Sequence, residues 1–401
     1  MAEHIFTDYN DATQALRIKD LKQSLYDDGE VIMDKVLVCL HGDEHKKRRK
    51  LENKIFTRDV FQKYENIIFP KTINETLEPY EESGKMDLVD FGFRVLLNLT
   101  ADFSGIDRPN KSKNETETLL KLLKIFASGA TLHHSTRDHE EVKSEVRDAL
   151  KEFDKNFLAP SIERRKAIIK KGRSEDLPND ILTVLLVNDD QLNMPYDVLQ
   201  REIAFYLLAG AQTSIHSLVH VFHEIHSWLK ENPEREDDVK NDPIFVQKCF
   251  LESTRLHPSS PVALRKPVCP VQLPDNKNAN VDDSVVIDLY NSNRDKKIFG
   301  SDAEKFNPDR ETPNGQNLYG LSFGLGMHSC IGRNLAAGVN SKSDTDPNNH
   351  HYGTVTMIMR KLISCDALPD INNSPKMDEK TKRPNWGYYP ITFSARENLS
   401  E

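Results

Sequence analysis

Cys330 stands out among the five cysteines of the chain because glycines, rather than packing residues, surround it. It lies in the stretch FGLGMHSCIGRNLA, just before a helical pattern over residues 331–339. A thiol at the start of a helix meets unpaired N–H groups and the positive end of the dipole, which lower its pKa. Gly324, Gly326 and Gly332 would let the backbone turn tightly beside a flat cofactor. Cys330 is a candidate metal ligand, although an isolated cysteine near a turn is more often structural.

Two pairs of charged residues lie at helical spacing. His45 and Arg49 are four residues apart in the basic run HKKRRK, and Glu252 and Arg255 are three apart in ESTR, so each pair shares one helix face. Taken alone, the first pair fits a solvated face or a nucleic-acid patch, and the second fits an ordinary surface ion pair.

A third candidate is the segment AGAQT, residues 209–213. Its small residues Ala209, Gly210 and Ala211 remove side-chain bulk, and the hydroxyl of Thr213 can bond a preceding carbonyl. These features predict a notch in a helix. The string is weak evidence alone, because small residues are common wherever helices pack closely.

The elements that carry these residues are mainly helical. Apolar residues recur at three- and four-residue steps up to about residue 260, and one helix is predicted from Pro195 to Glu231, about 37 residues or roughly 55 Å. Strands are expected over 285–290 and 390–395. Residues 340–353, NSKSDTDPNNHHYG, form a polar loop between two helical segments. These patterns predict one mainly α domain with small β-sheets.

Composition excludes several classes of protein. Hydrophobic residues make up 37% and charged residues 29%, and no apolar run approaches the roughly 18 residues of a membrane span. The net charge of −9 argues against general nucleic-acid binding. Five scattered cysteines do not form a disulfide framework, and no export signal precedes them. We therefore expect a cytoplasmic protein without a membrane anchor.

Together these motifs resemble those of one family. The pattern F-x-x-G-x-H-x-C-x-G-x-x-L-A, which begins at Phe323 and contains Cys330, is similar to the haem-binding signature of cytochrome P450 monooxygenases, and the soluble bacterial type fits best. The resemblance implies a single triangular domain over residues 1–401 that encloses haem b between the long helix and the cysteine segment. Cys330 would be the axial thiolate of the iron.

The resemblance also implies a role for each further candidate. Haem-binding residues would be His45, Arg49, Arg265, Phe323, Gly324, His328 and Gly332. The other residues of the basic run, Lys46, Lys47, Arg48 and Lys50, would lie on its outer face. A buried clamp on the cysteine side would consist of Glu252, Arg255 and Arg310. Catalytic residues around bound oxygen would be Gly210, Gln212 and Thr213, and substrate would contact Phe205, Leu208, Ala209, Pro261 and Val262.

Three features depart from the family pattern. Gln212 stands where an acid usually precedes the threonine, and an amide does not exchange a proton easily. His45 comes early, so we expect a shortened amino terminus in which the usual strands and helix are mostly missing. The polar insertion at 340–353 interrupts a normally continuous helix, on the side where electron donors dock.

The expected activity is therefore that of a haem-thiolate monooxygenase. It would insert one oxygen atom of O2 into a hydrophobic small molecule, with electrons from NAD(P)H relayed by a ferredoxin or flavin-type partner. A peroxide-using or non-oxygenating haem enzyme, or a degenerate haem-binding sensor, stays open as an alternative. A zinc site at His216, His220 and His223 is disfavoured, since no acidic or cysteine ligand accompanies them in sequence.

Overall fold

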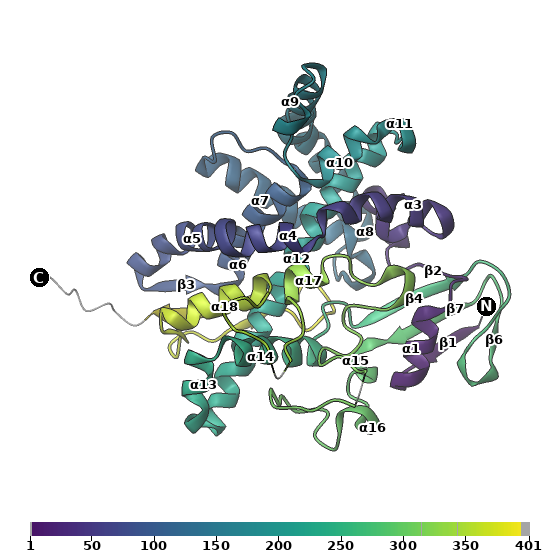
Figure 1. Cartoon of the computed structure of the whole chain (residues 1–401). Helices are drawn as coiled ribbons and strands as arrows, with labels where there is room; N and C mark the ends of the chain where they lie inside the picture. The colour runs from purple at the N-terminus through teal and green to yellow at the C-terminus, as the bar shows by residue number, and fades with distance from the viewer. Residues whose placement is uncertain (1, 314, 343, 394–401) are drawn as a thin grey trace, which may run out of the picture.

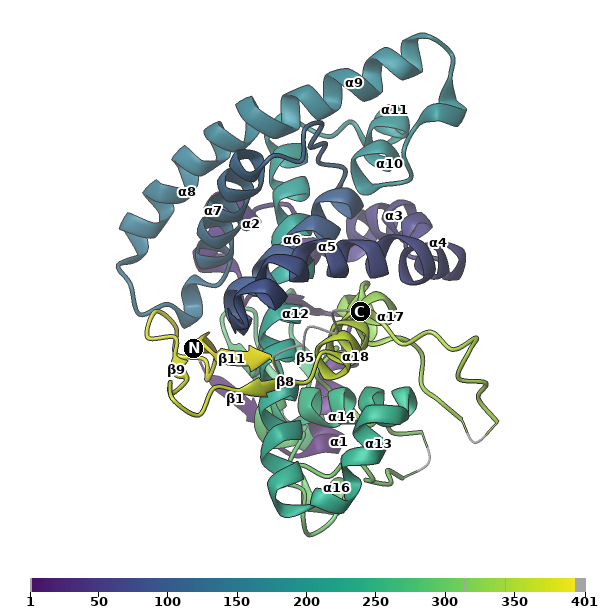
Figure 2. The same cartoon turned by 90° about the vertical axis from the view of Figure 1, so that its left-hand side faces the viewer.

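Helix α12 (Tyr196–Glu231) runs through the middle of the molecule, as Figure 2 shows. The structure, a computed structural model, describes residues 2–313, 315–342 and 344–393. Helix α12 has 36 residues and follows Pro195 as its cap, so its length is about 54 Å at 1.5 Å per residue. The predicted long helix is confirmed.

The chain is mainly helical with small sheets, as predicted, and Figure 1 shows helices α9 to α11 at the top and the four-stranded sheet at the right-hand side. The other helices are α1 (Tyr9–Arg17), α2 (Glu30–Met33), α3 (Gly42–Glu52), α4 (Arg58–Lys63), α5 (Phe69–Ser83), α6 (Leu88–Ser104), α7 (Lys113–Ala130), α8 (His139–Phe153), α9 (Ala159–Lys170), α10 (Ile181–Val187), α11 (Asp189–Leu192), α13 (Glu236–Asn241), α14 (Pro243–Leu256), α15 (Leu289–Ser292), α16 (Lys296–Phe299), α17 (Arg333–Ala337) and α18 (Thr354–Ser364). Among the described residues, no helix combines the length and apolar character needed to cross a membrane.

The strands form one four-stranded sheet and three smaller ones. The largest has the order β1 (Glu3–Phe6), β7 (Ser284–Asp288), β4 (Val262–Pro267), β2 (Leu21–Gln23), with β1 parallel to β7 and the other pairs antiparallel. A second sheet has the order β3 (Lys85–Asp87), β11 (Pro390–Phe393), β8 (Ala367–Pro369). Two-stranded pairs join β5 (Val271–Gln272) to β6 (Asn278–Ala279) and β9 (Lys376–Met377) to β10 (Trp386–Tyr388). The strands predicted at 285–290 and 390–395 correspond to β7 and β11, and residues 394 and 395 lie outside the described part.

The amino-terminal segment corrects one expectation. Strand β1, helix α1 and strand β2 all precede His45, and they cover one edge of the molecule together with β4 and β7. A second, smaller apolar core lies there, containing Phe6, Tyr9 and Ile287. The expectation that such elements are mostly missing was therefore wrong. They could not be read from the sequence because each is only three to nine residues long.

The main core surrounds α12, which packs closely along α6. Gly210 permits this close approach, since a Cβ atom there would lie 2.7 Å from Cγ2 of Thr100 on α6. A side chain at position 210 would push the two helices apart. The small residues predicted to form a notch therefore also serve helix packing.

The polar loop between α17 and α18 leaves the body of the protein and returns to its starting point (Figure 2). The N–H of Val339 donates to the carbonyl of His351 at 3.0 Å, which closes the loop at its base. His351 also bonds Glu65, and the Glu65 carboxylate accepts the N–H of Tyr352 at 2.6 Å. The predicted loop at 340–353 is present, with residue 343 outside the described part, and its base is anchored to the helical body.

Candidate functional site

A cavity of about 320 Å³ lies beside α12 and brings the predicted residues together. Its wall is formed by α12, α6, α3, the segment before β4 and the segment around Cys330. Predicted residues on this wall are His45, Arg49, Phe205, Ala209, Gly210, Thr213, Val262, Arg265, Phe323, Gly324, His328, Cys330 and Gly332.

Tight backbone turns hold Cys330 at the cavity. Its N–H donates to the carbonyl of Phe323 at 2.8 Å, which folds the intervening residues into a compact loop. Gly324 and Gly326 have φ of 62° and 69°, values that side chains disfavour, and a Cβ at Gly326 would lie 2.7 Å from the carbonyl oxygen of Leu16. The glycine pattern predicted from the sequence therefore fixes the cysteine in place.

The helix after Cys330 is shorter than predicted. Helix α17 spans only Arg333–Ala337, with Gly332 as its cap, instead of residues 331–339. Burial raises the pKa of the Cys330 thiol, while the N–H groups of Gly332 and Arg333 and the charge of Arg49 act to lower it. The dipole alone therefore does not hold a thiolate here. A bound cation would be needed, which is the situation of a metal-ligating cysteine.

Four nitrogen-bearing side chains meet on the same wall. The rings of His45 and His328 lie 4.8 Å apart between centroids, and neither nitrogen of either ring has a hydrogen-bond partner. Burial lowers the pKa of His45 to about 4 and that of His328 to about 3. Arg49 donates to the carbonyl of Ser329 at 2.6 Å, and Arg265 to the side-chain oxygen of Gln23 at 2.5 Å.

The charged side chains on the cavity wall are all basic. Arg49 and Arg265 line it, but no aspartate, glutamate or lysine does. Burial lowers the pKa of both guanidinium groups, to about 10 for Arg265, and neither group forms an ion pair with a carboxylate of the described residues. Two imidazoles without hydrogen-bond partners and two guanidinium groups without ion pairs fit a ligand that carries carboxylates. The donor set therefore fits haem, which carries two carboxylate groups and an iron that a cysteine could ligate.

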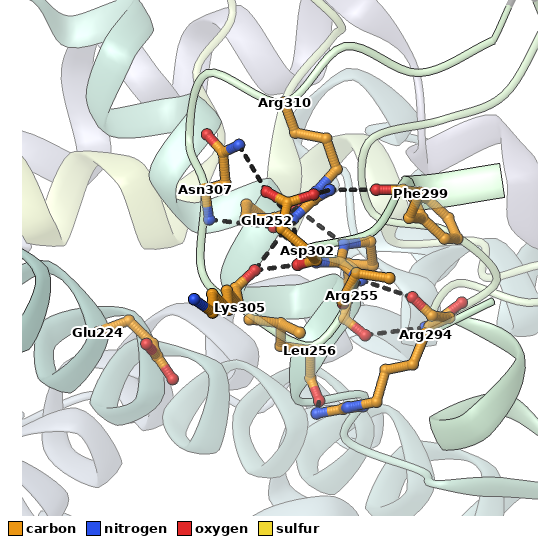
Figure 3. Close-up of polar contacts among 12 residues, drawn as sticks. Glu224, Glu252, Arg255, Leu256, Arg294, Phe299, Asp302, Lys305, Asn307 and Arg310 are labelled. Atoms are coloured by element: carbon orange, nitrogen blue, oxygen red, sulfur yellow. Dashed lines mark hydrogen bonds and ion pairs between the residues drawn. The ribbon is translucent and has the colours of Figure 1, made fainter. Parts of the chain in front are cut away.

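The predicted clamp is also assembled, and Figure 3 shows it. Arg255 bonds both carboxylate oxygens of Glu252, at 2.6 and 2.8 Å, and Arg310 donates to the same carboxylate at 3.0 Å. Arg255 also donates to the carbonyl of Ala303 at 2.7 Å, and Arg310 pairs with Asp302 at 2.7 Å. We call Glu252, Arg255, Asp302 and Arg310 the α14 cluster. It ties α14 to the chain that leads toward Cys330.

Two residues predicted to contact substrate lie elsewhere. Leu208 belongs to the main core, and neither Leu208 nor Pro261 is on the cavity wall. Leu208 follows Phe205 by three positions, but the helix turns it toward its packing partners. Gln212 is also off the wall, and its side-chain nitrogen lies 2.9 Å from Nε2 of His216. Thr213 does face the cavity, and its hydroxyl donates to the carbonyl of Ala209 at 2.9 Å, as predicted.

Sequence reasoning missed a second buried cluster. Arg48 was expected on the outer face of the basic run, but it is 4% exposed and bonds both Glu52 and Glu202. The hydroxyl of Tyr206 donates to Glu52 at 2.6 Å, and the N–H of Leu37 donates to Glu202 at 3.0 Å. We call Arg48, Glu52, Glu202 and Tyr206 the α3–α12 cluster. Arg48 and Glu52 are four residues apart, which was the available signal, but Glu202 is too distant in sequence to be inferred.

The histidines of α12 pair with other groups. His220 stacks on His257 with ring centroids 4.2 Å apart, and His223 lies 3.0 Å from the hydroxyl of Tyr389. Within the described ranges, no group of three or more histidine, cysteine, aspartate or glutamate side chains could hold a metal ion.

Comparisons with known proteins show the family to which the chain belongs. A family model described as Cytochrome P450 matches residues 2–338. The chain is 26% identical over 346 residues to pulcherriminic acid synthase of Bacillus subtilis (strain 168), across 82% of this chain and 78% of that protein.

Solved structures give the same fold. The crystal structure of CalO2 superposes with a TM-score of 0.75 at 17% identity, across 98% of this chain and 90% of that chain. That of P450BioI in complex with hexadec-9Z-enoic acid ligated acyl carrier protein gives 0.73 at 17% identity, across 97% and 92%.

Proposed function

The chain belongs to the cytochrome P450 family of haem-thiolate enzymes, and we propose that it inserts one oxygen atom of O2 into a neutral, largely apolar small molecule. The observation that carries this proposal is that Cys330 and Thr213 lie on the same cavity wall. The side chains that could bind carboxylates lie together on that wall as well. Cys330 supplies a ligand to iron, and Thr213 supplies a hydroxyl beside the reacting centre.

The chain's own residues hold the cofactor. Cys330 provides the sulfur ligand, and His45, Arg49, Arg265 and His328 are the proposed partners of the two propionates. Haem bound in this way would supply the activation of O2, with the second oxygen atom leaving as water. Neither imidazole has a hydrogen-bond partner among the described residues, so a ring N–H of each is free to donate to a carboxylate.

Helix α12 forms the reacting wall. Ala209 and Gly210 leave space beside the hydroxyl of Thr213, which is available to hold or pass a proton. Phe205 and Val262 present apolar surface that orients a substrate and excludes water. Gln212 faces His216 instead of the cavity, so protons reach Thr213 by solvent or by substrate groups.

The proposal includes the source of electrons. Reduction of O2 with insertion of one oxygen atom consumes two electrons, which we assign to NAD(P)H through a ferredoxin or flavin-type partner protein. The test supplies a surrogate reductase and isotopically labelled O2 with a panel of apolar compounds. One labelled oxygen atom per product molecule, in a fixed ratio to reductant consumed, supports the proposal; reductant-independent product contradicts it.

A peroxide-using or non-oxygenating activity is the second candidate. Its supporting observation is Gln212, which lies off the cavity wall and has a side-chain amide, a group that does not exchange a proton easily. Product formed with peroxide but not with O2 and reductant selects this candidate. Turnover with neither oxidant selects a haem-binding sensor, against which the exposed hydroxyl of Thr213 argues.

A further inference from the structure

A strip of hydroxyl groups lies on the cavity wall next to Thr213. Thr213 and Ser217 come from α12, and Ser259 and Ser260 come from the segment between α14 and β4. Since Thr213 and Ser217 are four residues apart, they share one face of the helix. The strip therefore continues one turn beyond the predicted reacting centre.

Three of the four hydroxyl protons are used by backbone carbonyls. Thr213 donates to the carbonyl of Ala209 at 2.9 Å, Ser259 to that of Thr213 at 3.2 Å, and Ser260 to that of Val262 at 2.8 Å. A hydroxyl has one proton to donate and two lone pairs that accept. These three side chains consequently have only accepting capacity left.

The fourth proton is used as well. The side-chain oxygens of Ser217 and Ser259 lie 3.3 Å apart. Because Ser259 already donates to the carbonyl of Thr213, the bond between the two serines requires Ser217 to donate. The backbone carbonyl of Ser259 also accepts from Arg383 at 3.1 Å, which holds this segment in position. The strip thus presents oxygen lone pairs, and no donor, to the cavity.

The wall has other polar side chains, among them Tyr26, Ser214 and Thr254. Its charged groups, Arg49 and Arg265, are assigned to the propionates, and the hydroxyl of Tyr206 donates to Glu52. The strip differs from these groups because two serine hydroxyls from different segments lie within hydrogen-bond distance of each other. A substrate with an N–H or O–H group would find accepting oxygens along this strip.

We propose that Ser217 and Ser259 form an acceptor subsite, and that the substrate is a neutral apolar molecule carrying at least one N–H or O–H group. This rests on the proposed function, since it concerns the substrate of the same cavity. An acceptor-only group, such as a ketone or an ether, would face lone pairs there and lose its hydrogen bond to water.

The test compares cyclododecanol with cyclododecanone on the haem-loaded protein by titration calorimetry. The two probes share a ring, but only the alcohol can donate. We expect the alcohol to bind roughly fivefold to tenfold more tightly, the effect of one net hydrogen bond. Equal affinity, tighter binding of the ketone, or no measurable binding of the alcohol overturns the proposal.

Two single variants should act in opposite directions. Ser217→Ala removes an acceptor and should weaken alcohol binding, whereas Ser259→Ala frees the proton of Ser217 to face the cavity and should strengthen ketone binding. Ser128→Ala is the matched control, since Ser128 is a partly exposed serine of α7 whose hydroxyl donates to the carbonyl of Lys124. A merely structural role would shift both ligands equally in each variant, which contradicts the subsite.

The haem absorption of each variant is recorded in parallel. Calorimetry reports binding without turnover, so the alcohol preference can persist even where the oxygenase assay fails. A missing preference in a protein that oxygenates normally removes the subsite alone.

Discussion

The two buried charge clusters contain similar residue types in different proportions. The α14 cluster has two guanidinium groups and two carboxylates, and its remaining donors reach backbone carbonyls such as that of Ala303. The α3–α12 cluster has one guanidinium group for two carboxylates. The first is balanced in charge. The second has a surplus carboxylate.

This difference determines where a proton is held. Burial and the nearby charge of Glu202 raise the pKa of Glu52 to about 8, and burial also raises the pKa of Glu202. In the α14 cluster, by contrast, hydrogen bonds from Arg310 help lower the pKa of Asp302. The α14 cluster is therefore a charge-balanced clamp, while the raised pKa of Glu52 favours a retained proton in the α3–α12 cluster.

The largest expected effect is in the balanced cluster. Arg255→Ala would leave Glu252, which is fully buried, without its bidentate partner, at a cost of about 3–5 kcal/mol in the free energy of unfolding. Urea unfolding measures it. Arg173→Ala, which removes an exposed pair to Asp176, is the control and should cost at most about 1 kcal/mol. Equal losses of unfolding free energy in both variants would show that the buried cluster stabilises the protein no more than an exposed ion pair does.

The second effect uses the surplus carboxylate. Arg48→Met should destabilise the protein by about 3 kcal/mol, because Glu52 and Glu202 would then face each other without a cation. Adding Glu202→Gln removes one of the two acids and should restore part of the loss. If the double variant is less stable than Arg48→Met alone, the clusters do not differ in charge balance as described.

Arg49 and Lys50, two adjacent residues of α3, allow a residue of the cavity wall to be compared with an exposed neighbour. Arg49→Ala should lower haem retention by about 1.5–3 kcal/mol, the value of a charge-assisted hydrogen bond, while Lys50→Ala should leave it unchanged because Lys50 is exposed. Haem loss to an acceptor protein under mild denaturant measures both. Matching loss rates would remove Arg49 from the propionate set.

The effect that is smallest per pH unit is a pH dependence of stability. Between its ordinary value of 4.5 and about 8, Glu52 keeps a proton in the folded state that the unfolded chain releases. Stability should therefore fall as pH rises through this window, by at most about 1.4 kcal/mol per pH unit, and level off above it. Glu52→Gln should flatten that slope.

Comparing wild type with Glu52→Gln also controls for two histidines. His45 and His328 have depressed pKa values, so their contribution to the stability of the folded state falls as pH drops below about 6.5. They act in both wild type and Glu52→Gln, and subtraction isolates Glu52. An unchanged slope in the variant would place the retained proton elsewhere.

The sequence predicted the residues whose neighbours are local. Cys330 and its glycines, the pair Glu252 and Arg255, and helix α12 follow from spacing within one segment. Arg48 was misplaced because its partner Glu202 is 154 positions away, and no local pattern links them. Leu208 shows a different limit. Spacing along the helix places Leu208 on one helix face, but the sequence does not indicate which segment packs against that face.

The most direct test of the haem-thiolate account is the absorption of the reduced, carbon-monoxide-bound protein. Wild type should show the strongly red-shifted band of a thiolate-ligated haem, and so should Cys269→Ala, whose cysteine is exposed and away from the cavity wall. Cys330→Ala should lose that band while the helical fold, followed by circular dichroism, persists. A red-shifted band of unchanged intensity in Cys330→Ala would contradict the ligand assignment and the mechanism that depends on it.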